Sequence, residues 1–167
     1  MRKLKRPTDH RLALMRNLAT NLLWYGKIET TFAKAKEVSS YAEKLLTQAI
    51  NTYEDSVKAT KKVVDSKGVT TTVEVYQDGP KKLAARRKLM SKLYPIKEIR
   101  LPKESKQSFV ARTEDIRHPL IEKIFNELAP KYAKRNEELQ CSGGYTRVLK
   151  LGTRQGDSTE MAIITLI

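Results

Sequence analysis

The closing stretch of the chain, residues 143–167, reads GGYTRVLKLGTRQGDSTEMAIITLI and decides much of the fold. YTRVLKL and MAIITLI are short runs rich in β-branched and aliphatic side chains, and the turn-rich loop GTRQGDSTE separates them. We therefore expect two strands, at residues 145–151 and 161–167, and a hairpin loop whose glycines supply the turn conformations.

Four of the seven glycines lie in this stretch with basic residues between them, as in some phosphate-binding loops. A Walker loop needs a lysine and a hydroxyl residue after its last glycine, and a helix beyond. Here Asp157 and Ser158 follow the last glycine, a strand is expected next, and the spacing of a dinucleotide fingerprint is absent. Two interpretations stay open. The stretch is a plain hairpin, or its glycines let a nucleic-acid backbone come close while Arg147, Lys150 and Arg154 reach the phosphates.

The first 50 residues predict a helix, a short strand and a second helix. The first helix spans residues 8–25, where Thr8 or Asp9 can cap it and Gly26 can stop it. KIETT follows as a strand signal, and Thr31 then caps the helix FAKAKEVSSYAEKLLTQAI. The side chains expected to face the core are Leu12, Met15, Ala19, Leu22 and Leu23 in the first helix, and Val38, Tyr41, Ala42, Leu45, Leu46 and Ala49 in the second.

The start of the second helix is a candidate phosphate site. A helix N-terminus offers free N–H groups and a partial positive charge, and here Thr30, Thr31, Lys34 and Lys36 stand beside it. The ordinary alternative is capping by Thr31 with two solvated lysines. We favour the phosphate interpretation because the N-terminal arm, residues 1–7, is also basic.

The middle of the chain, residues 51–118, has a different character. Residues 63–80 contain two β-branched runs around Lys67-Gly68 and predict a β-hairpin. Residues 81–94 predict a basic helix, and residues 95–117 show no clear period, which indicates an extended connector.

A third main helix is expected from Pro119 to Arg135. Pro130 should kink or break it, because proline removes a backbone donor and its ring clashes with the preceding turn. The side chains expected to point inward are Leu120, Ile121, Ile124, Phe125 and Leu128.

The charge balance indicates a polyanionic partner. The chain has 33 Lys and Arg against 19 Asp and Glu, and a net charge of +14 repels itself unless a polyanion meets it. Nine basic and two acidic residues lie in residues 1–36, and ten and two lie in residues 81–106, which include Arg86, Arg87 and Lys88. Two dense basic segments on a balanced chain favour nucleic acid. An anionic membrane surface is the weaker alternative, because no apolar run approaches the ~20 residues that span a bilayer.

Few residues could carry chemistry. The one cysteine, Cys141, excludes an internal disulfide and a multi-cysteine zinc site. His10 and His118 have no ligand spacing, and no carboxylate pair is spaced for acid–base catalysis. For His10, a phosphate or base-stacking contact and plain exposure are both open. We therefore expect no catalytic site, no bound metal and no cofactor, in a soluble, intracellular protein.

Four segments, in this order along the chain, resemble one family. They are RKLKRPTDHRLALMRNLATNLL, KIETTFAKAKEVSSYAEKLLTQA, IEKIFNELAPKYAKRN and GGYTRVLKLGTRQGDSTEMAIITLI. They are similar to the bacterial large-subunit ribosomal protein L17 family, over residues 2–50 and 119–167. The most specific parts are HRxxxxRNLxxxL, IETTxAKAKE and GGYTRxxKxGxRxGDxxxMA, and several independent motifs in the right order make coincidence a poor explanation.

The resemblance implies an α+β fold with helices packed on one side of a small mixed three-stranded sheet, together with an inserted hairpin and basic helix. We expect one domain over residues 8–167, behind the basic arm at residues 1–7. The resemblance also implies a structural protein without catalysis, in the cytoplasm, within the large ribosomal subunit. Its partners would be large-subunit ribosomal RNA near the exit of the peptide tunnel and neighbouring large-subunit ribosomal proteins, with no membrane and no small-molecule substrate.

The resemblance assigns RNA contacts to polar and basic residues of the motifs. They are Arg2, Lys3, Arg6, His10, Arg11, Arg16, Asn17, Thr30, Thr31, Lys34, Lys36, Tyr145, Arg147, Lys150 and Arg154. For their charge we add Lys5, which stands where the family commonly has glycine, and Arg86, Arg87 and Lys88. The arm is expected to be disordered alone and to order on RNA.

The chain departs from the family's pattern in its middle. Residues 51–118 far exceed the usual connector, and we recognise no counterpart for the hairpin or for residues 95–117. The charge of residues 81–106 suggests a further contact with ribosomal RNA or with a neighbouring protein. Two rival functions stay open: a DNA-binding architectural protein, which would share the charge, and a nucleotide-dependent enzyme acting on RNA.

Overall fold

The two ends of the chain meet in one three-stranded sheet, in a computed structural model that describes residues 2–64, 70–114 and 116–167. The strands β1 (Lys27–Thr31), β5 (Glu160–Leu166) and β4 (Thr146–Thr153) lie side by side in the order β1-β5-β4. The fold class is α+β, as expected. Both pairings are antiparallel, so the prediction of a mixed sheet is wrong. A hairpin joins β4 to β5, and β1 runs against β5 on its other side.

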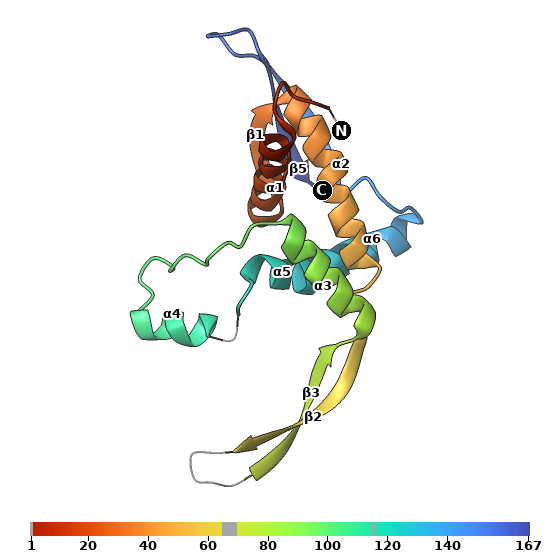
Figure 1. Cartoon of the computed structure of the whole chain (residues 1–167), viewed down its shortest axis with the longest axis vertical. Helices are drawn as coiled ribbons and strands as arrows, with labels where there is room; N and C mark the ends of the chain where they lie inside the picture. The colour runs from red at the N-terminus through yellow and green to blue at the C-terminus, as the bar shows by residue number, and fades with distance from the viewer. Residues whose placement is uncertain (1, 65–69, 115) are drawn as a thin grey trace.

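Two helices, α1 (Thr8–Tyr25) and α2 (Phe32–Ile50), cover one face of this sheet (Figure 1). Their bounds match the expected ones, but their caps differ. Pro7 precedes α1, and no side chain caps the helix; Thr31 holds the N-cap position of α2 but makes no side-chain capping hydrogen bond. Gly26 ends α1 as expected, with φ of +79°, and its N–H donates to the carbonyl of Leu22 at 2.8 Å.

A first cluster of buried side chains lies between these helices and the sheet. Its members are Met15, Leu22, Ala35, Val38, Ala42, Ala162 and Ile164. Leu12 was expected in the core but is 40% exposed. The helical pattern placed Leu12 on the buried face of the helix, and this prediction is wrong.

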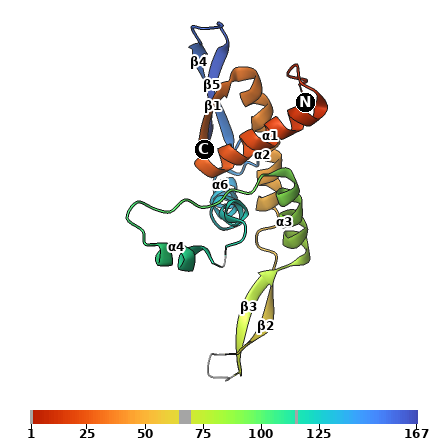
Figure 2. The same ribbon diagram turned by 60° about the vertical axis from the view of Figure 1, so that its left-hand side comes forward.

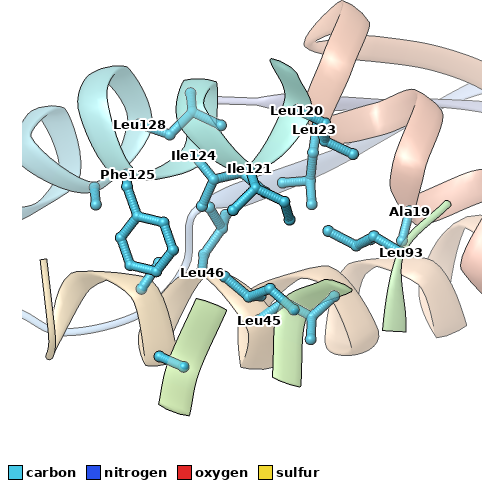
Figure 3. Close-up of a cluster of buried hydrophobic side chains, with 14 of the residues drawn as sticks. Ala19, Leu23, Leu45, Leu46, Leu93, Leu120, Ile121, Ile124, Phe125 and Leu128 are labelled. Atoms are coloured by element: carbon cyan, nitrogen blue, oxygen red, sulfur yellow. The ribbon is translucent and has the colours of Figure 1, made fainter. Parts of the chain in front are cut away.

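A second cluster lies below the first, where α2 meets the third main helix (Figure 3). Leu45 and Leu46 of α2 and Leu23 of α1 pack there against Ile124 and Phe125. Since α2 places Val38 and Ala42 in the first cluster and Leu45, Leu46 and Ala49 in the second, its inner face is buried along most of the helix.

The third main helix is continuous and longer than predicted. It comprises α5 (Pro119–Lys123), a π-helical turn (Ile124–Leu128) and α6 (Ala129–Leu139). Pro130 neither breaks nor ends it. The wide π turn lies directly before α6, where the missing N–H of Pro130 would interrupt regular α-helical hydrogen bonding.

The central segment forms a ribbon, a helix and a connector. The strands β2 (Ser56–Val64) and β3 (Thr70–Asp78) are an antiparallel pair that starts earlier than the hairpin expected at residues 63–80. The expected turn at Lys67-Gly68 falls outside the described residues. Figures 1 and 2 both place this β2–β3 ribbon at the end of the molecule opposite the β4–β5 hairpin.

The basic helix α3 (Pro80–Lys92) follows the ribbon as predicted, and the connector behind it contains a helix that the sequence analysis missed. This helix, α4 (Lys106–Thr113), begins where the N–H of Ser108 donates to the hydroxyl of Ser105 at 3.1 Å. It buries no residue, so its sequence has no apolar period from which a helix could be predicted.

The ribbon and α3 share one fixed junction. The carboxylate of Asp55, directly before β2, accepts hydrogen bonds from the backbone N–H groups of Lys81 at 2.7 Å and Lys82 at 3.2 Å, so it caps α3. The N–H of Gly79 donates to the carbonyl of Asp55 at 2.8 Å. A Cβ atom on Gly79 would overlap this carboxylate, which explains why glycine stands there.

We predict that Gly79→Ala lowers the free energy of unfolding by about 1 kcal/mol relative to Gly156→Ala, as measured by urea denaturation. The added methyl must displace Asp55 and so removes the cap of α3, a loss of about that size. Gly156 is the matched control because a Cβ there meets no atom within 4 Å. In an Asp55→Ala background the difference between the two substitutions should vanish, and an equal difference in both backgrounds would contradict the explanation.

Candidate nucleic-acid interface

The N-terminal arm has a defined shape in this structure. The N–H of Arg6 donates to the carbonyl of Lys3 at 3.1 Å and closes a turn, and Leu4 packs against the first cluster. Arg2 lies 3.7 Å from Glu37 of α2, while Lys3, Lys5 and Arg6 are exposed. An apolar contact thus holds the turn against the domain, and the disorder expected of the arm without RNA stays a prediction.

The predicted residues of α1 divide between surface and interior. His10 and Asn17 are exposed, whereas Arg11 and Arg16 are half-buried. Burial raises the pKa of Tyr41 above its ordinary value, an effect that the neighbouring charge of Arg16 opposes. Arg16 thus faces Tyr41 of α2, at some distance from the arm.

The start of α2 contains a residue that the sequence analysis did not single out. Phe32, the first residue of α2, is half-buried, and its ring centroid lies 4.7 Å from the ammonium nitrogen of Lys36 and 4.6 Å from that of Lys150 on β4. An aromatic residue four positions before a lysine in a helix is a signal that could have identified it. Thr30 is buried, and Thr31 and Lys34 are half-buried.

The β4–β5 hairpin carries basic residues on both of its faces. Successive side chains of a strand point to opposite faces of the sheet, so Val148 and Lys150 share one face and Arg147 lies on the other. Val148 packs toward the helices, and exposed Arg147 therefore points away from them. Near the tip, Arg154 donates to Asp157 through Nε at 3.0 Å and Nη2 at 2.5 Å. These hydrogen bonds hold the pKa of Asp157 well below its ordinary value.

One end of the molecule gathers most of these groups, and we call it the arm–hairpin end. It consists of residues 2–11, 32–37 and 150–160, and both views place the arm, the start of α2 and the β4–β5 hairpin together (Figures 1 and 2). These segments contain nine Lys or Arg and four acids. Two of the acids, Glu37 and Asp157, pair with Arg2 and Arg154. Because basic residues outnumber acids in these segments, their net charge is positive.

Two groups of predicted residues lie elsewhere. Tyr145 is 1% exposed and its ring centroid lies 5.0 Å from that of Tyr132, so its side chain belongs to the second cluster. Arg87 and Lys88 are exposed on α3, away from the arm–hairpin end. The structure therefore does not bring every predicted RNA contact onto one surface.

Arg86 of α3 is half-buried between two carboxylates. Its guanidinium donates to Asp78 of β3 and to Glu122 of α5, and Lys82 lies 3.3 Å from the same Asp78. Burial would raise the pKa of Asp78, but Arg86 and Lys82 together hold it below its ordinary value. Arg86 thus joins the ribbon, α3 and α5 and fixes their relative direction.

The described helices include none that is long and apolar enough to cross a bilayer. Within residues 2–64, 70–114 and 116–167, no three His, Cys, Asp or Glu side chains are grouped so that they could hold a metal ion. Cys141 is a free, exposed thiol.

The chain matches the family described as Ribosomal protein L17 over residues 14–167. It belongs to the ribosomal protein L17 family. The match confirms the resemblance carried by the sequence motifs, and it places the chain among structural ribosomal proteins rather than enzymes.

Curated members of the L17 family align with nearly the whole chain. The proteins named large ribosomal subunit protein bL17 from Acetivibrio thermocellus and Lachnospira eligens are 38% and 39% identical to it over aligned lengths of 190 and 185 residues. The alignments cover 99% of this chain and 98% of each relative. The protein of that name from Clostridium acetobutylicum is 37% identical over 166 residues, covering 99% of this chain and 96% of its own length.

These aligned lengths bear on the central segment of this L17 protein. The alignment of 166 residues covers 99% of a chain of 167, so it also runs across residues 51–118. No counterpart for the hairpin is recognisable in the sequence motifs, yet this relative has residues there. The reason is a weaker sequence pattern: among the residues whose burial is described, most side chains of the ribbon and connector are exposed or half-buried, and no distinctive motif marks them.

We predict that Arg86→Gln lowers the free energy of unfolding by about 2 kcal/mol, because it leaves two partly buried carboxylates without their shared partner. The matched control is Arg87→Gln, on the exposed neighbouring position, which should change stability by no more than about 0.5 kcal/mol. Urea denaturation of both variants measures the difference. Equal stabilities would contradict a structural role for Arg86.

Proposed function

We propose that this chain is a structural component of the large ribosomal subunit that binds large-subunit ribosomal RNA near the exit of the peptide tunnel. The arm–hairpin end is the proposed RNA interface. Its exposed or half-buried polar and basic members are Arg2, Lys3, Lys5, Arg6, His10, Arg11, Lys34, Lys36, Lys150 and Arg154. Neighbouring large-subunit ribosomal proteins are the other proposed partners.

The concentration of unneutralised cations at this end carries the proposal. Lys3, Lys5 and Arg6 make no ion pair with any residue that the structure describes, and the arm that holds them is anchored beside α2. A protein of net charge +14 that sets such groups on one end loses stability through their repulsion. A phosphate backbone removes that repulsion. The relatives named as large-subunit proteins support the choice of RNA.

The proposed mechanism is charge neutralisation on a fixed scaffold. Lysine and arginine side chains release condensed counterions when they contact phosphates, which gives affinity without reading sequence. Specificity then comes from the folded shape of the RNA and its unpaired bases, since side chains cannot read the deep groove of an A-form helix. Arg87, Lys88 and Arg147 are exposed on other faces and are available for additional phosphate contacts.

We predict that Lys3→Gln reduces the slope of log affinity against log salt by about 0.7–0.9, the share of one phosphate contact. The measurement is filter binding of the full chain to large-subunit ribosomal RNA between 50 mM and 200 mM salt. Lys134→Gln, an exposed lysine on α6 at a distance from the arm, is the matched control and should leave the slope unchanged.

Competition with duplex DNA of equal length tests the remaining alternative. The proposal predicts that ribosomal RNA displaces the DNA and that DNA does not displace the RNA at equal phosphate concentration. Equal competition would favour a DNA-binding architectural protein. Equal effects of Lys3→Gln and Lys134→Gln would remove the arm from the interface.

A further inference from the structure

The ring of Phe32 holds two lysines that come from different elements. Lys36 lies one helical turn further along α2, and Lys150 lies on β4, yet both ammonium nitrogens lie within cation–π distance of the same ring centroid, at 4.7 Å and 4.6 Å. Both lysines are exposed, while the ring itself is half-buried and packs against the first cluster. The core therefore fixes the aromatic side chain, and the two ammonium groups make cation–π contacts with its ring.

Nothing in the described structure neutralises these two charges. Neither lysine forms an ion pair with a carboxylate among the described residues. The two acids of α2 closest in sequence are occupied: Glu37 by Arg2, and Glu43 by the backbone N–H and hydroxyl of Thr146 at 3.2 Å and 2.8 Å. Two like charges placed against one ring repel, and an anion that binds both removes this repulsion.

The spacing between α2 and β4 is fixed three residues along the chain from Lys36 and four residues from Lys150. The hydroxyl groups of Ser39 and Thr146 lie 2.6 Å apart in a hydrogen bond, and Glu43 binds the same threonine. The position of the Phe32 ring, and the spacing of the two elements that carry Lys36 and Lys150, are thus set by packing and hydrogen bonds before any partner arrives. A preorganised pair of cations binds an anion more tightly than two free lysines, because less side-chain entropy is lost.

We propose that Phe32 is a positioning residue that presents Lys36 and Lys150 together to one stretch of the RNA backbone, where the two ammonium groups bind its phosphates as a unit. This inference rests on the proposed RNA-binding function and adds a defined subsite to it. The ligand chemistry is the phosphodiester group. The ring makes no contact with the RNA and acts through the two lysines that it orients.

The test is a set of substitutions at these three positions, read as affinity of the full chain for large-subunit ribosomal RNA. Lys36→Gln and Lys150→Gln should each weaken binding about five- to eightfold at 0.1 M salt, the effect of one lost phosphate contact. Because the lysines act as a unit, the double variant should bind more tightly than the product of the two single effects predicts.

Substitutions of Phe32 give the more specific test. Phe32→Leu keeps an apolar side chain for the core and all charges, but removes the ring, so it should weaken binding by a factor similar to that of one lysine substitution. Phe32→Tyr keeps the ring face and should restore wild-type affinity. In the Lys36→Gln/Lys150→Gln background, Phe32→Leu should have no further effect. Thermal unfolding of each variant confirms that it is folded before binding is measured.

The outcomes separate this inference from the function on which it rests. If the wild-type chain does not bind ribosomal RNA in preference to duplex DNA, the proposed function fails. If it binds, but the lysine effects multiply independently, or Phe32→Leu binds like the wild type, the RNA-binding function stands and the subsite is overturned. A loss on Phe32→Leu that persists in the double-lysine background would also overturn it, because the ring would then act by another route.

Discussion

Burial of α2 in two separate clusters is the constraint on which the rest of the structure depends. Its inner face contributes Ala35, Val38 and Ala42 to the contact with the sheet, and Leu45, Leu46 and Ala49 to the contact with the third main helix. One helix thereby connects the sheet, built from both ends of the chain, to the third main helix. Its outer face is left free for polar and charged side chains, among them Lys36.

This arrangement gives the two ends of the molecule different properties. At one end, the arm, the start of α2 and the β4–β5 hairpin hold cations on short, well-anchored elements (Figure 1). At the other, the β2–β3 ribbon extends from a junction in which Asp55 caps α3 and Arg86 bridges two carboxylates. Basic residues therefore have two roles here. Those at the arm–hairpin end are largely unpaired, while Arg86 forms ion pairs that stabilise the fold.

The sequence was most informative where structure is periodic and locally encoded. The bounds of α1 and β1 and the glycine stop at Gly26 follow from apolar spacing, β-branched residues and turn chemistry. It was least informative where tertiary contacts decide. α4 buries nothing, the π turn before Pro130 depends on how a helix absorbs a proline, and the antiparallel sheet depends on long-range pairing.

The candidate site shows the same division. Charge density and motif position pointed to the arm and to Lys34, Lys36, Lys150 and Arg154, but could not reveal that Tyr145 is buried or that Arg86 is ion-paired. Both facts depend on residues distant in sequence, namely Tyr132 for the first and Asp78 and Glu122 for the second. The role of Phe32 likewise becomes visible only when β4 brings Lys150 to its ring.

The most direct measurement of the central claim is the acetylation rate of individual lysines, read by mass spectrometry in intact large ribosomal subunits and in the free protein. The account predicts that Lys3, Lys36 and Lys150 are protected in the subunit and regain their reactivity when the RNA is digested with ribonuclease. Lysines at the arm–hairpin end that react equally in the subunit and in the free protein, or that stay protected after digestion, would contradict it.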